Sequence, residues 1–110
     1  MTNNFHAYDA ALGMVYALRR VLEQLTKKDR ALADQLRRAA SSVALNIAEG
    51  NRRAGQDRLQ FFRIAAGSGA EVMAAQEVAR AWGHIDAAPV AEGELDRVLA
   101  MLWRLTHRRE

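Results

Sequence analysis

Apolar residues recur at alternating steps of three and four along most of the chain, which is the period of a helix with one buried face. Together with the residues that interrupt it, this period predicts helices over residues 8–25, 29–49, 56–82 and 90–108. The apolar positions that carry the pattern in the first, second and fourth segments are Ala11, Val15, Leu18, Leu22 and Leu25, then Leu32, Leu36, Ala39, Val43 and Ile47, and finally Ala91, Leu95, Val98, Leu102 and Leu105.

Residues that typically end or begin helices separate the four segments. Asp29 is a good helix cap, Gly50 is a typical helix end, Gly83 closes the third segment, and Pro89 suits the first turn of the fourth. The joints are short, so consecutive helices should run antiparallel. We therefore expect a single all-α domain over residues 1–110, folded as an up-down-up-down four-helix bundle.

The third segment is apolar on two faces. One row of apolar and small residues continues the bundle pattern, and a second row, which includes Leu59, Phe62 and Met73, lies about 110–130° around the helix. A helix with two apolar faces must bury both. We expect the second face, together with Leu99 and Trp103 on the fourth segment, to contact another subunit. The alternative is a wide core within one subunit.

The composition fits a helical domain and excludes several classes of protein. Half of the 110 residues are hydrophobic, 22 are alanine and seven are aromatic. Alanine favours helices over strands, so an all-β or α/β fold is not expected. Cysteine is absent, which excludes disulfides and thiolate metal sites. Neither a signal peptide nor a membrane-spanning stretch is apparent, so we expect a cytoplasmic protein.

Positive charge is concentrated in one half of the chain. Residues 19–63 contain eleven basic and five acidic residues, whereas residues 64–107 contain three basic and six acidic ones. A basic half is typical of proteins with an anionic partner, so RNA or DNA is a candidate. The alternative is an ordinary solvated helix surface. The candidate nucleic-acid contacts are Lys27, Lys28, Arg37, Arg52 and Arg53.

A stripe of polar residues follows one side of the second segment. Its members are Gln35, Arg38, Ser42, Asn46 and Glu49, and Ser68 and Glu71 follow on the third segment. We expect a structural network in which Arg38 pairs with Glu49 or Glu71 and Asn46 bonds Ser68. The glycines on either side of Ser68 should let the second segment approach closely. The alternatives are a ligand site and an enzyme that uses the stripe for acid–base work.

Other searches for chemistry give nothing. His6, His84 and His107 are too far apart for a helical metal site. No phosphate-binding loop or dinucleotide fingerprint is present. A DNA-binding helix-turn-helix over residues 29–64 would present Phe61 and Phe62 where polar base contacts are needed. We therefore expect no catalytic residue, no cofactor and no metal.

The run QLRRAASSVALNIAEG over residues 35–50, followed by Phe62, residues 64–68 and Glu71, resembles the "four helix bundle protein" family. This family is also known from proteins encoded in intervening sequences of bacterial 23S ribosomal RNA genes. More distantly, it includes the accessory variability proteins of diversity-generating retroelements. The family motif falls on Arg38, Ser42, Asn46, Glu49, Gly50, Gly67, Ser68 and Glu71, and this chain departs from it at Arg52, Arg53 and Gly69.

The resemblance implies a bundle that assembles into a homo-oligomeric ring, typically a pentamer. It also implies an association with nucleic acid in the retroelement members and no established enzymatic activity. The expected function is therefore a non-catalytic accessory or scaffold protein that binds RNA or DNA, in some cases with a second protein. The alternative is a purely structural or protein-binding assembly with no nucleic-acid role.

Overall fold

The fold is all-α. The computed structural model describes residues 3–86 and 92–107, and within these ranges it contains five helices and no strand. The helices are α1 (Asn3–Ala17), α2 (Arg19–Lys28), α3 (Arg30–Asn51), α4 (Gly55–Ala81) and α5 (Glu92–Thr106). None of these helices is both long enough and apolar enough to cross a membrane.

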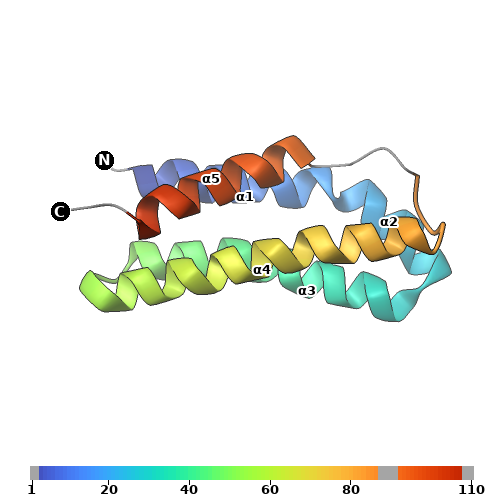
Figure 1. The fold of residues 1–110 in the computed structure, drawn as a ribbon, viewed down its shortest axis with the longest axis horizontal. Coiled ribbons are helices and arrows are strands. Elements are labelled where there is room, and N and C mark those ends of the chain that lie inside the picture. The colour runs from blue at the N-terminus through green and yellow to red at the C-terminus, as the bar shows by residue number, and fades with distance from the viewer. Residues whose placement is uncertain (1–2, 87–91, 108–110) are drawn as a thin grey trace.

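The helices lie side by side along one long axis, and the molecule measures 45 × 21 × 19 Å (Figure 1). α1 and α2 follow one another along one side, and α3 returns toward the end at which α1 begins (Figure 1). α4 then runs back beside α3, and α5 runs beside α1 and α4. The start of α1 and the end of α5 therefore lie at the same end of the molecule.

The segment expected as one helix over residues 8–25 is divided at Leu18. The backbone of Leu18 has φ −81° and ψ −6°, which departs from α-helical values toward the bridge region near φ −90° and ψ 0°. Its N–H is shared between the carbonyls of Met14 and Val15, at 3.0 and 3.1 Å, so hydrogen bonding continues through the bend. The Leu18 side chain is fully buried. The apolar face is therefore continuous, although the helix is not straight.

The ends of the helices follow from local chemistry. The carboxylate of Asp29 accepts the N–H of Leu32 at 3.1 Å and caps α3, as its position in the sequence predicts. Gly55 and Gly83 have φ values of +60° and +78°, a backbone conformation that side chains disfavour. The helix end expected at Gly50 and Asn51 is confirmed, because α3 ends at Asn51. Pro89, expected in a first helical turn, falls outside the described residues.

Both apolar faces of α4 are largely buried within the chain. Its buried residues, which come from both of the apolar rows seen in the sequence, are Phe62, Ala65, Gly69, Val72, Ala75, Gln76 and Ala79. α4 lies between α3 and α5, so each row has a neighbour inside the subunit. The wide intramolecular core, and not a spare face awaiting a second subunit, accounts for most of the second row.

Candidate nucleic-acid interface

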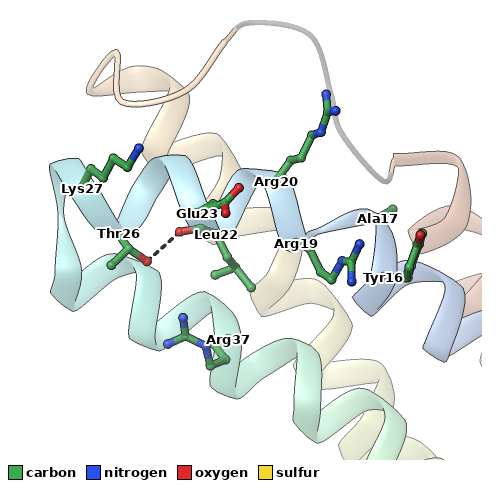
Figure 2. Close-up of a pocket in the computed structure, with 9 residues that line it drawn as sticks. All are labelled: Tyr16, Ala17, Arg19, Arg20, Leu22, Glu23, Thr26, Lys27 and Arg37. Atoms are coloured by element: carbon green, nitrogen blue, oxygen red, sulfur yellow. Dashed lines mark hydrogen bonds between the residues drawn. The ribbon is translucent and has the colours of Figure 1, made fainter.

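A basic hollow lies along α2, where α1, α2 and α3 meet (Figure 2). It is open to solvent and has a volume of about 1100 Å³. It is lined by Tyr16, Ala17, Arg19, Arg20, Leu22, Glu23, Thr26, Lys27 and Arg37. We call this feature the α2 hollow. Its lining carries four cationic side chains against a single carboxylate.

The helical period of α2 explains why these side chains face solvent. Val21 and Leu25 are buried in the core, and Arg19, Arg20 and Lys27, on other sides of the helix, are exposed. Arg20 points away from α3 in Figure 2. The hydroxyl of Thr26 donates to the carbonyl of Leu22 at 2.6 Å, so the inner wall of the hollow is tied to the backbone.

Two of the side chains in the α2 hollow are positioned by specific partners. The guanidinium of Arg19 lies 4.2 Å from the centre of the Tyr16 ring, a cation–π distance. Tyr16 remains 67% exposed. Arg37, from α3, forms an ion pair with Asp34 at 3.0 Å, and both side chains are more than half exposed. Such a pair contributes little to stability, so Arg37 can exchange Asp34 for another anion.

The structure divides the expected nucleic-acid contacts into two groups. Lys27 and Arg37 lie in the α2 hollow, and Lys28 is the exposed last residue of α2. Arg52 and Arg53 follow α3 at the opposite end of the molecule (Figure 1).

The distant pair of arginines is largely neutralised by local carboxylates. Glu49 lies 3.7 Å from Arg52 and 2.8 Å from Arg53, and Asp57 lies 3.7 Å from Arg53. Arg58, which the sequence did not single out, donates to the carbonyls of Gly50 and Asn51 at 3.1 and 3.3 Å. It satisfies carbonyl groups at the end of α3.

Three members of the polar stripe meet where α3 packs on α4. The hydroxyls of Ser42 and Ser68 are 2.7 Å apart, and the amide of Asn46 donates to both the hydroxyl and the carbonyl of Ser42 at 2.9 Å. The contact to Ser68 therefore comes from Ser42 and not from Asn46. We call these three residues the serine–asparagine cluster.

The remaining members of the stripe lie apart from this cluster. Glu49 pairs with the arginines that follow α3. Gln35, Arg38 and Glu71 are exposed, and within the described ranges neither Arg38 nor Glu71 forms an ion pair. The sequence also predicts that α3 approaches α4 closely at Gly69. In the structure Gly69 instead faces Leu99 of α5.

The residues expected at a subunit contact have different environments. Phe62 is 1% exposed and lies against Gly50 inside the subunit, so its side chain is not accessible to a second chain. Leu59, Met73 and Leu99 are partly buried, and Trp103 is 60% exposed. Within residues 3–86 and 92–107, no group of three or more metal-binding side chains is found.

Comparisons with known proteins agree with this architecture. A solved structure from Bacteroides thetaiotaomicron, described as a protein of unknown function from the S23 ribosomal protein family, has a similar fold. The TM-score is 0.66 and the sequences are 14% identical, over 91% of each chain. No curated protein matches the sequence. The family model described as 23S rRNA-intervening sequence protein matches residues 3–104. The chain belongs to the 23S rRNA-intervening sequence protein family.

Proposed function

We propose that the protein is a non-catalytic, cytoplasmic accessory protein that binds RNA or DNA as a homo-oligomer, with the α2 hollow as the contact surface. Each subunit is an up-down-up-down four-helix bundle in which α1 and α2 count as one bent helix. Several subunits, typically five, form a ring. The serine–asparagine cluster has a structural role and takes no part in chemistry.

The observation that carries this proposal is the uneven charge of the α2 hollow. Arg19, Arg20, Lys27 and Arg37 line it with Glu23 as the only carboxylate of the lining. Nucleic-acid backbones present a dense row of negative charges, and binding releases the counterions that surround them. The arginines after α3 are poorer candidates because two guanidinium groups there lie beside two carboxylates, whereas the four cations of the α2 hollow lie beside only Glu23 and Asp34.

Assembly would multiply a small basic surface. A single subunit with a net charge of +3 offers few phosphate contacts. When one hollow in a ring has bound, the other hollows are held near the same polymer, so the combined affinity greatly exceeds that of one site. This supports a link between assembly and binding.

The test compares two variants that each remove two positive charges. Arg20→Gln/Lys27→Gln changes the α2 hollow, and Arg52→Gln/Arg53→Gln is the matched control at the other end of α3. Fluorescence anisotropy with labelled structured RNA and labelled duplex DNA, at about 50 and 200 mM salt, gives the slope of log K against log salt. We expect the slope of the first variant to fall by about 0.9 for each duplex phosphate that the variant no longer neutralises. The control should bind nearly as the wild type does.

Two results would contradict this assignment. Equal weakening by the two variants would mean that diffuse charge, and not the α2 hollow, attracts the polymer. Absence of binding at about 50 mM salt would exclude the nucleic-acid role, since electrostatic binding is strongest there. Circular dichroism and light scattering on each variant establish that fold and assembly are unchanged.

The second candidate is a structural or protein-binding assembly, and one observation favours it. Ile64 and Val78 of α4 are 41% and 45% exposed, and Trp82, directly after α4, is 70% exposed. They form a row within about 40° of one another at 100° per residue, but Ile64 lies about 21 Å along the helix from Val78, with the exposed Glu71 between them. Exposed apolar side chains of this kind are typical of a protein–protein contact. This candidate becomes the preferred one if the anisotropy experiment detects no binding.

A further inference from the structure

We propose that a second hollow, between α4 and α5, binds one nucleotide unit, with its base stacked on Trp103 and its phosphate on Arg63. The hollow has a volume of about 450 Å³ and is lined by Arg63, Ala66, Leu99, Trp103, Thr106 and His107. We call it the Trp103 hollow. Its volume is within the usual range of about 300–1,000 Å³ for small-molecule sites. This site extends the proposed function. It rests on the proposed function only if the bound nucleotide is part of an RNA or DNA strand.

The ring of Trp103 is held in place on one side. It stacks on His107, with ring centres 4.2 Å apart and planes 9° from parallel. Although one face is covered, Trp103 is still 60% exposed, so its other face is open to solvent. A planar base can stack on that face, and stacking is worth about 1–3 kcal/mol per base.

Hydrogen bonds fix His107 under the tryptophan. Nδ1 of His107 lies 2.9 Å from the carbonyl of Trp103, and because a carbonyl only accepts, Nδ1 carries the hydrogen. The hydroxyl of Thr106 donates to the carbonyl of Leu102 at 2.8 Å and lies 3.1 Å from Nδ1 of His107. The stack is thus formed before any ligand arrives, which lowers the entropic cost of binding.

Arg63 supplies the charge that selects an anionic ligand. Arg63 belongs to α4 and lines the same hollow. It is exposed, and it forms no ion pair among the described residues. Ala66 and Leu99 provide an apolar floor between the two helices. An open aromatic face and a guanidinium match the base and the phosphate of a nucleotide.

The other tryptophan offers a natural control. Trp82 is also exposed, at 70%, but its centre lies 6.2 Å from that of His84. His84 lies 3.5 Å from the carboxylate of Asp29. The sequence contains two tryptophans, and therefore Trp82→Phe leaves Trp103 as the sole reporter and Trp103→Phe leaves Trp82.

The experiment follows tryptophan emission while the full-length protein is titrated with AMP, with adenosine and with a single-stranded oligoadenylate. In the Trp82→Phe protein we expect saturable quenching, because the base stacks on Trp103. In the Trp103→Phe protein we expect none. Saturation by AMP identifies a free nucleotide as a sufficient ligand, and saturation by the oligoadenylate alone identifies a strand as the source. Either result supports the site.

Arg63→Gln, made in the Trp82→Phe protein, separates the phosphate contact from stacking. We expect it to weaken AMP binding by roughly two- to fivefold, as for an exposed ion pair, and to leave adenosine binding unchanged. If only the oligoadenylate binds, the same comparison is made between the oligoadenylate and its uncharged methylphosphonate analogue. A weakening that is equal for charged and uncharged ligands would show that Arg63 does not contact phosphate.

Three results would overturn the proposal. These are no quenching by any ligand, equal quenching of both tryptophans, and emission from Trp103 that is already blue-shifted and protected from acrylamide because a second copy covers it. The same titrations on Arg20→Gln/Lys27→Gln keep the two sites apart. Loss of polymer binding with retained AMP quenching in that variant would show that the two hollows are separate sites. A wild-type protein that binds no polymer but still shows AMP quenching would remove the proposed function and leave the Trp103 hollow standing.

Discussion

Gly50 and Gly67 have opposite surroundings, although both are glycines inside long helices. A Cβ atom built on Gly50 would lie 2.5 and 2.8 Å from two ring carbons of Phe62. That ring is 1% exposed, so the core around it leaves it no room to move. A Cβ atom on Gly67 would meet no heavy atom within 4 Å. Gly50 is therefore required by packing, whereas Gly67 is not required within the subunit.

Gly50→Ala and Gly67→Ala should consequently change stability in opposite directions. We expect Gly50→Ala to lower the free energy of unfolding by about 1–3 kcal/mol, since it overpacks the contact with Phe62. We expect Gly67→Ala to raise it by about 0.5–1 kcal/mol, through the better helix propensity of alanine. Urea unfolding followed by circular dichroism measures both. Equal effects in the two variants would contradict this account.

At the scale of elements, α3 and α4 are joined by more than apolar packing. The serine–asparagine cluster places a hydrogen bond between the two helices at 2.7 Å, in a partly buried position. Asn46 reinforces the bond from its own helix. A directional bond of this kind favours one register of α3 against α4, because a shift by one residue would separate Ser42 from Ser68.

A double-mutant cycle on Ser42→Ala and Ser68→Ala measures this link. We expect each single variant to lower the free energy of unfolding, and the two changes to be non-additive by about 0.5–1.5 kcal/mol, the usual net value of one hydrogen bond. Strictly additive effects would mean that the hydroxyls do not interact in solution. Asn46 is left unchanged, so that its amide is the same in every corner of the cycle.

At the scale of the whole molecule, the α2 hollow gathers cations along α2, and Ile64 and Val78 are exposed apolar side chains of α4. The two kinds of surface are not fully separated, because Tyr16 in the α2 hollow and Leu45 of α3 are also exposed. The proposed self-association and the proposed binding of a polyanion would nevertheless use different helices.

Val78→Arg tests whether the row on α4 takes part in self-association. Val78 is 45% exposed, so the substitution should leave helix content unchanged, while the buried charge would disfavour a contact between subunits. We expect the mass measured by light scattering to fall toward the 12.2 kDa of one chain. Leu12→Arg, at a residue of α1 that is 44% exposed, is the matched control. A wild type that is already monomeric would contradict the proposal.

The periodic features were predicted from the sequence, and the features that depend on contacts between helices were not. The all-α fold follows from apolar spacing, and the cap at Asp29 from a local residue pattern. The bend at Leu18 was not predicted, because no glycine or proline stands at that position. For the second apolar row on α4 the sequence predicts a subunit contact, with a wide core as the alternative, because its partner, α5, is distant in sequence.

The candidate site was predicted only in part for the same reason. Lys27 and Arg37 were identified from charge, but nothing in the sequence indicated that they share a hollow with Tyr16 and Arg19. The spacing of three between Tyr16 and Arg19 was the one available signal, because it places both on one side of a helix. Arg63 and Trp103 are 40 positions apart and meet only through the packing of α4 on α5.

The bend at Leu18 lies beneath the α2 hollow, whose lining includes Tyr16 and Ala17 before the bend and Arg19 and Arg20 after it. The angle between α1 and α2 thus determines how far apart these four residues lie. Leu18 is fully buried, and Met14 before the bend and Val21 after it are buried as well. We therefore expect a substitution of Leu18 in the core to change the shape of the α2 hollow while every residue that lines the hollow remains the same.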